Sequence, residues 1–188
     1  MLKTMLELTY TIDLSNEPFD NLKYRDRTAL VLCMDEKNNY ILGGHNSYYP
    51  AGIVRMIGGG IDHAETEIEG AIREVKEEIG LTIQPQDLAE LLAIKVIGTF
   101  QKRSYTTKIF VYSLQVKYSD LKVGDDVHNL VQYTENEYKN LIQRYFDLSK
   151  INIENPQDVS FSWSDYGKVY GFIHEVALKS IKSRDSVD

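Results

Sequence analysis

The sequence has few of the features that mark membrane or secreted proteins. Its 188 residues include a single cysteine, so an internal disulfide is excluded. It contains no run of about 18 apolar residues, so no transmembrane helix is expected. The N-terminal segment mixes Glu, Thr and Asp with apolar residues and lacks the continuous apolar core of a signal peptide. We therefore expect a cytoplasmic protein with no membrane partner.

Positive charge is also in short supply. Lys and Arg number 21 against 28 Asp and Glu, which gives a formal net charge of −7. Proteins that coat nucleic acid normally present a basic face, so no nucleic-acid polymer is expected as a partner. A small phosphorylated ligand is still compatible with this charge, because divalent cations can neutralise an acidic site and its anionic ligand together.

The apolar pattern predicts one α+β domain over residues 1–188, with an N-terminal strand extension at about 1–24 and a frayed tail at about 182–188. Apolar and polar residues alternate from Leu6 to Leu14, as in a half-buried strand, whereas Thr28 to Met34 is apolar on both faces and indicates a central strand. The other expected strands are 40–42, 54–57, 91–100 and 105–116, the last two forming a hairpin. Later helices are expected at about 135–145, capped by Thr134, and from Ser162 or Ser164 to Ile181.

Residues 58–81, GGGIDHAETEIEGAIREVKEEIGL, hold seven carboxylates and two basic side chains. Thr66 and Glu69 have the spacing of a capping box, which predicts a helix that begins here. Gly80 suits the position just after the helix. An apolar stripe at helical spacing is expected to pack on the sheet; its residues are Ile68, Ala71, Ile72, Val75 and Ile79.

Glu74, Glu77 and Glu78 share another face of this helix. Like charges at these spacings destabilise a helix by roughly 0.2–0.5 kcal/mol per pair. A hard divalent cation with oxygen ligands would relieve the repulsion. For three glutamates alone, a solvated face is the more common explanation. The three preceding glycines favour the cation site, because a backbone without side chains lets its carbonyls approach a ligand.

The same segment carries a complete motif. Gly59, five residues, Glu65, seven residues and then REVKEEIGL (73–81) match G-x5-E-x7-R-E-U-x-E-E-x-G-U, with U aliphatic, at every defined position. The chain therefore resembles the Nudix hydrolase superfamily over roughly Arg25 to Ile181. Two neighbouring positions depart from the common pattern, since Ile57 replaces a frequent proline and Ala64 a frequent glycine. Neither change removes a ligand.

The resemblance implies a Nudix-type α/β/α sandwich with a mixed β-sheet. It also implies a hydrolase that cleaves a phosphoanhydride bond in a nucleoside diphosphate linked to another group. By that resemblance, Mg²⁺ or Mn²⁺ is assigned to Glu74, Glu77, Glu78 and the backbone carbonyl of Gly58. Arg73 would orient these glutamates, and Glu65 would support the loop or a second metal shell. A further acid would act as base or ligand; the candidates are Asp125, Asp126, Glu135 and Glu137, of which Asp126 is preferred.

The sequence indicates the identity of the substrate less clearly than the type of reaction. Tyr48 and Tyr49 could stack on a base. Arg55, Arg103, Lys102 and Lys108 could contact phosphates, although packing and solvation are ordinary alternatives for all six residues. A non-catalytic Nudix-like nucleotide-sensing module is the alternative function, and a purely structural domain with a solvated acidic helix ranks last. Apolar surface on the first strand or the last helix could support a homodimer.

Overall fold

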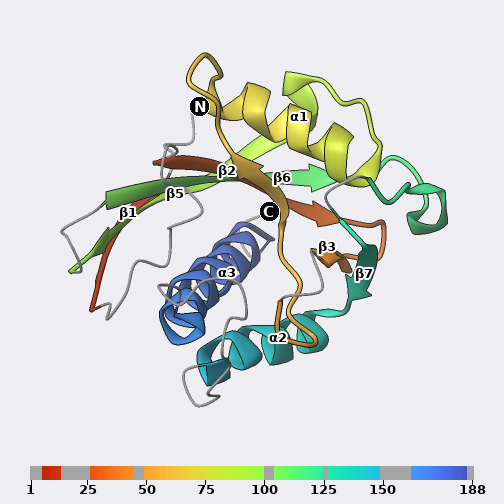
Figure 1. Cartoon of the computed structure of the whole chain (residues 1–188). Coiled ribbons are helices and arrows are strands. Elements are labelled where there is room, and N and C mark those ends of the chain that lie inside the picture. Colours follow the sequence, from red (N-terminus) through yellow and green to blue (C-terminus); the bar gives the residue numbers. More distant parts are fainter. Residues whose placement is uncertain are drawn as a thin grey trace.

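The computed structural model describes residues 6–13, 26–44, 49–99, 104–124, 127–148 and 162–185. Within these ranges, seven strands form one sheet and three α-helices pack against it (Figure 1). The strands are β1 Leu6–Ile12, β2 Arg27–Met34, β3 Tyr40–Gly44, β4 Ile57–Gly60, β5 Leu88–Gly98, β6 Ser104–Ser113 and β7 Asn129–Tyr133. The helices are α1 Glu67–Ile79, α2 Glu135–Asp147 and α3 Trp163–Asp185. No helix in these ranges is long and apolar enough to cross a membrane.

The sheet is mixed, with strand order β1-β5-β6-β2-β3-β7. β1 runs parallel to β5 and β2 parallel to β6, whereas the other pairs are antiparallel. One edge of β2 is shared by two short strands, because β4 pairs with Thr28 to Val31 and β3 with Cys33 and Met34. This arrangement places β4 beside the central strand β2, and α1 packs against it.

The two faces of the sheet carry different helices. α1 covers one face, while α3 and α2 cover the other (Figure 1). Successive side chains of a strand point to opposite faces. Along β2, Leu30 and Leu32 accordingly join the core beneath α2 and α3, and Val31 and Cys33 join the core beneath α1. The predicted α/β/α sandwich with a mixed sheet is confirmed.

Helix α1 begins and ends where the sequence predicts. The Glu69 carboxylate accepts a hydrogen bond from the Thr66 backbone nitrogen at 2.8 Å, and the Thr66 hydroxyl accepts one from the Glu69 backbone nitrogen. Gly80 ends the helix with a φ of 72°, a left-handed conformation that glycine adopts without a steric penalty. The loop at 121–124, which comes after β6, contacts this helix end, where the Gly124 nitrogen donates to the Glu78 carbonyl at 3.0 Å.

The short strand before α1 differs from its prediction. It was expected at 54–57, whereas β4 comprises Ile57 and the three glycines themselves. A Cβ atom on Gly58, whose φ is 132°, would lie 2.2 Å from the Ala29 carbonyl oxygen. Only a residue without a side chain can approach β2 this closely, so the glycine run is a paired strand rather than a loop.

Two further elements differ from the expected ones. β7 was not predicted; it is a short, half-buried edge strand paired with β3, so its pattern carries little periodicity. α3 continues to Asp185, past the expected start of fraying at Lys182. Lys182 bonds Glu135 at 2.7 Å, and Arg184 donates to the Leu91 carbonyl at 3.0 Å, so both ends of this last turn are tied to other elements.

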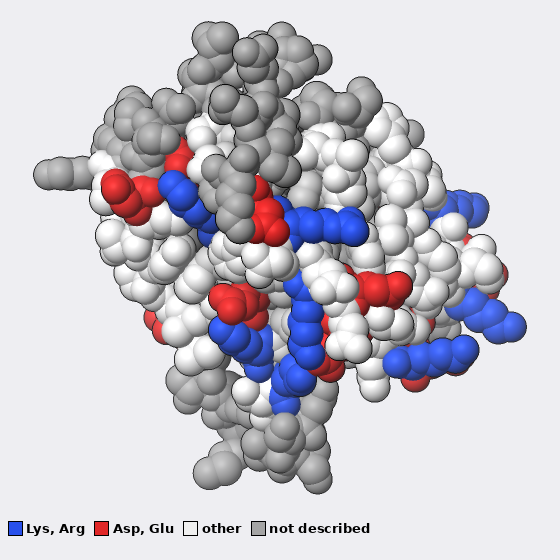
Figure 2. All heavy atoms as spheres, turned by 90° about the horizontal axis from the view of Figure 1, so that it is seen from below, with Lys and Arg blue, Asp and Glu red and all other residues white. Residues whose placement is uncertain are grey.

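Charged side chains are mixed by sign on the face opposite to α1. Figure 2 views the molecule from below, where blue basic and red acidic side chains lie interspersed over the described surface. Surface ion pairs of the described residues include Lys139 with Glu135 and Lys179 with Glu175. Exposed pairs of this kind contribute at most about 1 kcal/mol each to stability.

Candidate metal-binding and catalytic site

Arg73 is the centre of a hydrogen-bonded cluster on α1. Its guanidinium donates to both carboxylate oxygens of Glu65, at 2.8 and 3.2 Å, and to the Gly60 carbonyl at 2.8 Å. It also donates to Glu74 and Glu77, each at 2.8 Å. The planar fork of five N–H groups makes such divergent contacts possible for arginine and not for lysine. Arg73 thereby connects the loop before the helix to two of the three candidate metal ligands.

Glu78 and Glu74 are buried against the glycine strand. Glu78 is 1% exposed, and its carboxylate accepts a hydrogen bond of 2.9 Å from the Gly58 backbone nitrogen. Glu74 is 7% exposed, and its Oε1 atom would lie 2.6 Å from a Cβ atom on Gly59. The glycines therefore make room for the carboxylates as well as for β2. The more common explanation considered from the sequence, an acidic helix face exposed to solvent, therefore does not apply to these two side chains.

Burial has an electrostatic consequence for Glu74. Desolvation raises the pKa of its carboxyl group, and the neighbouring charge of Glu77 adds to the rise. Arg73 opposes the shift by a hydrogen bond and by its charge, and the charge of Arg55 acts in the same direction. A cation bound beside these carboxylates would favour their charged forms.

The donor chemistry of this cluster fits a hard divalent cation. Glu74, Glu77 and Glu78 offer only carboxylate oxygens, the ligands that Mg²⁺ and Mn²⁺ prefer. Within the described ranges, however, no three acidic, histidine or cysteine side chains already converge in the arrangement of a metal site. The reason lies in their present partners, since Glu74 and Glu77 turn toward Arg73 and Glu78 toward Gly58. A cation at this site would compete with Arg73 for two carboxylates.

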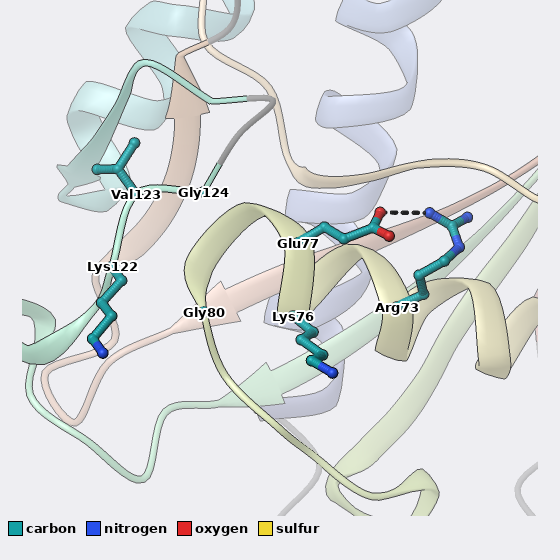
Figure 3. Close-up of a pocket in the computed structure, with 7 residues that line it drawn as sticks. All are labelled: Arg73, Lys76, Glu77, Gly80, Lys122, Val123 and Gly124. Atoms are coloured by element: carbon teal, nitrogen blue, oxygen red, sulfur yellow. Dashed lines mark hydrogen bonds and ion pairs between the residues drawn. The ribbon is translucent and has the colours of Figure 1, made fainter.

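An open groove of about 420 Å³ borders the cluster. In Figure 3 the Glu77 carboxylate points toward Arg73, whereas Lys76 and Lys122 extend in another direction. The groove runs between the outer face of α1 and the loop after β6, and a ligand held at Glu77 would reach it. Its lining residues are Arg73, Lys76, Glu77, Gly80, Lys122, Val123 and Gly124. The sequence did not predict that residues 122–124 line this groove. The one feature that could have indicated it is Gly124, which precedes two acidic residues.

The candidate substrate residues are only partly placed. Tyr49 is half-buried, with its ring 5.3 Å from that of Trp163 in an edge-to-face contact. Its hydroxyl accepts a hydrogen bond of 3.3 Å from Arg55. Tyr48, Lys102, Arg103 and the candidate acids Asp125 and Asp126 lie outside the described residues.

Three other candidates have partners that explain them without a ligand. Glu135 forms ion pairs with Lys139 and Lys182 at the start of α2. Glu137 completes a capping box with Thr134 at the same helix end. Lys108 pairs with Glu90 at 2.6 Å. For Glu135 and Glu137 these contacts give a structural role, and the preference for Asp126 stays a prediction from the sequence.

Comparisons with known proteins indicate the family and the fold. Residues 24–163 match the family model described as NUDIX domain. A bifunctional NMN adenylyltransferase/ADP ribose pyrophosphatase from Francisella tularensis, solved with AMP and a manganese ion, aligns with 80% of this chain and 42% of its own at 13% identity and a TM-score of 0.50. At this identity the likeness supports the fold alone.

Two other solved structures are similar at lower scores. An Ap4A hydrolase from C. elegans aligns over 86% of this chain and 99% of its own, with 14% identity and a TM-score of 0.49. A MutT/nudix family protein from Enterococcus faecalis aligns over 57% of this chain and 43% of its own, with 17% identity and a TM-score of 0.47. The matched region thus spans less than half of the Enterococcus and Francisella proteins. A comparison with curated proteins finds no match.

Proposed function

The chain belongs to the Nudix family, and on this basis we propose that it is a divalent-metal-dependent hydrolase. Its substrate class is a nucleoside diphosphate linked to another group, in which it cleaves a phosphoanhydride bond. The observation that carries the proposal is the burial of Glu74 and Glu78 against Gly59 and Gly58. Two nearly dehydrated carboxylates on adjacent turns of one helix are costly unless a cation or a donor compensates them.

Glu74, Glu77 and Glu78 are the side chains that would hold Mg²⁺ or Mn²⁺, together with the Gly58 carbonyl. Such an ion neutralises phosphate charge and polarises phosphoryl oxygens when it is bound. Arg73 is a positioning residue in this proposal, because its fork fixes the directions of Glu74 and Glu77 and anchors them to Glu65. The rigid base of the site is β4, which the sheet holds through Thr28 to Val31.

The reaction itself is a hydrolysis. A water oxygen forms a bond to one phosphorus of the anhydride, the bridging P–O bond breaks, and the leaving phosphate takes the electron pair. The water proton passes to a carboxylate that acts as base, for which Asp126 is the candidate preferred from the sequence. Positioning and charge neutralisation supply most of the catalysis in such phosphoryl transfers.

The test is product analysis by phosphorus NMR and mass spectrometry in ¹⁸O-labelled water. The panel comprises nucleoside triphosphates, ADP-ribose, nucleotide sugars, dinucleoside polyphosphates and coenzyme A, each with Mg²⁺ and with Mn²⁺. We expect cleavage of at least one compound by the wild type, and cleavage at least roughly 100-fold slower by Glu78→Gln. The position of the label then identifies the phosphorus that water attacks. No cleavage of any compound by the folded wild type would contradict the hydrolase.

A nucleotide-sensing module without turnover is the second candidate. It is favoured by one observation, namely that Glu74, Glu77 and Glu78 all have protein partners before any cation binds. Nucleotide binding without cleavage in the same panel would support this module and reject the enzyme.

A further inference from the structure

Arg55 lies in the segment between β3 and β4, and its backbone is fixed there. Its N–H and C=O groups both pair with Gly43, each at 2.8 Å. Three residues later, Gly58 holds the carboxylate of Glu78. The start of the Arg55 side chain is therefore held in a constant place relative to the candidate metal ligands.

The guanidinium of Arg55 contacts two tyrosines. Its Cζ atom lies 5.4 Å from the ring centre of Tyr170, and one terminal nitrogen donates to the Tyr49 hydroxyl at 3.3 Å. Tyr170 in turn stacks on Tyr166, with ring centres 4.3 Å apart. An arginine packed on aromatic faces keeps its in-plane N–H groups directed past the rings, where they can bind an oxyanion in a fork.

The positive charge of Arg55 has no acidic partner among the described residues. None of their carboxylates forms an ion pair with it. Its Nε atom is buried and has no hydrogen-bond acceptor. Burying a polar N–H without an acceptor costs on the order of 1–3 kcal/mol, and a charged group costs more. The packed protein thus leaves one strong donor unused.

Arg55 nevertheless lies within electrostatic range of the acidic cluster. Its charge acts on Glu74, and the charge of Glu78 acts on Arg55. On its other side are the aromatic rings of α3. An anion placed between Arg55 and a cation held by these glutamates would be attracted from both sides.

We propose that Arg55 binds a phosphate group of the substrate. This phosphate is the neighbour of the one that contacts the metal ion held by Glu74, Glu77 and Glu78. The inference rests on the proposed function and extends it from the metal site to the substrate. It requires a substrate with at least two adjacent phosphates, one for each positive centre. Tyr49 fixes the guanidinium in this role through the hydrogen bond to its hydroxyl.

The test uses metal-free conditions, so that binding at Arg55 is separated from metal-dependent hydrolysis. Trp163 is the single tryptophan, and its ring centre lies 5.3 Å from that of Tyr49. Its fluorescence should therefore respond to a ligand bound at Arg55. Inorganic pyrophosphate and ADP are titrated into the full-length protein in EDTA, with calorimetry as a second readout. We expect Arg55→Gln to weaken binding by roughly 10- to 100-fold, the loss of one or two hydrogen bonds to a charged group.

Two further variants complete the experiment. Arg55→Lys keeps the charge but not the fork, so we expect affinity between those of the wild type and Arg55→Gln. Lys37→Gln removes one positive charge from the exposed turn between β2 and β3, and we expect unchanged affinity. Thermal unfolding checks that each variant is folded.

The outcomes distinguish this inference from the hydrolase proposal. We expect Glu78→Gln, which loses metal-dependent cleavage, to bind pyrophosphate in EDTA at least as tightly as the wild type, because a negative charge near Arg55 is gone. Binding that depends on Arg55 without any cleavage would reject the hydrolase and keep the phosphate site. Equal affinities of the wild type and Arg55→Gln, or no binding by either, would overturn the inference.

Discussion

The carboxylate of Glu78 lies 2.9 Å from the backbone nitrogen of Gly58, although the two residues are 20 positions apart. This hydrogen bond joins the acidic helix to the glycine strand, which itself pairs with the central strand β2. The position of Glu78 in the candidate metal site is therefore fixed by the sheet. Sites held by such rigid elements keep the precise geometry that catalysis requires.

Replacing Glu78 with Gln separates charge from shape. The amide oxygen of Gln can still accept the hydrogen bond from Gly58, so the folded structure should be retained. The negative charge is lost, and we expect metal-dependent activity to fall by at least roughly 100-fold. Loss of a residue that only orients a metal ligand lowers activity by up to about 100-fold, and loss of a ligand itself should cost at least as much. Glu175→Gln on the exposed side of α3 is the matched control and should keep its rate. Full activity of a folded Glu78→Gln protein would count against a metal role.

Gly58→Ala tests the close approach of β4 to β2. The new Cβ atom would meet the Ala29 carbonyl oxygen, and the φ of 132° is unfavourable for alanine. We expect the free energy of unfolding in urea to fall by at least about 1–3 kcal/mol. Gly70→Ala is the control, because its nearest neighbour is a side-chain atom at 3.3 Å and its change should stay within about 1 kcal/mol. Equal stability of the two variants would show that the glycine strand tolerates a side chain.

Arg73→Lys tests the orienting fork. One ammonium group cannot contact Glu65, Glu74 and Glu77 together as the guanidinium does. We expect activity to fall by about 10- to 100-fold and the metal concentration for half-activation to change. Combining it with Glu65→Gln should give a coupling of about 0.5–3 kcal/mol, because the two side chains touch. Strictly additive effects would place the two residues in separate roles.

His174 predicts a pH dependence of stability. It is fully buried beneath the sheet, and burial, with a smaller contribution from the charge of Arg55, lowers its pKa to about 3. In the unfolded chain the pKa is near 6.5. Below that pH only the unfolded state takes up the proton, so stability should fall by up to about 1.4 kcal/mol per pH unit toward pH 3. Above about 6.5 the histidine is neutral in both states and contributes no slope.

The measurement is urea unfolding at a series of pH values. His174→Asn should show a shallower loss of stability between pH 6.5 and pH 4 than the wild type, whatever its absolute stability. The asparagine can still accept the hydrogen bond that the Tyr138 hydroxyl shares with Nδ1. His128→Asn, at an exposed position, should follow the wild-type slope. Identical slopes for all three proteins would contradict the buried neutral histidine.

Several parts of the fold could be predicted from the sequence, because they depend on residues close together in the chain. The ends of α1 follow from Thr66, Glu69 and Gly80, whose effects reach only one helical turn. The continuous apolar run of β2 reflects its two covered faces. The spacing of Glu74, Glu77 and Glu78 already put them on one side of a helix. Other parts of the fold could not be predicted, because they depend on contacts with residues distant in the chain.

The strand position at Gly58 is one such case. Glycine has a low strand propensity, and its pairing with Leu30 becomes visible only when the sheet is assembled. Arg55 is another, since nothing in its sequence neighbours indicates that Tyr170 will lie against it.

The sequence by itself determined the family motif and the acidic helix, because spacing and periodicity encode them locally. The sandwich of helices on a mixed sheet was expected only through the family that this motif resembles. Only the tertiary structure decided that Glu74 and Glu78 are buried against glycines while Glu77 stays half-exposed. It also decided that Arg55 is a cation without an acidic partner among the described residues. Burial and charge compensation are properties of the assembled neighbourhood, where strands and helices from distant parts of the chain displace water together.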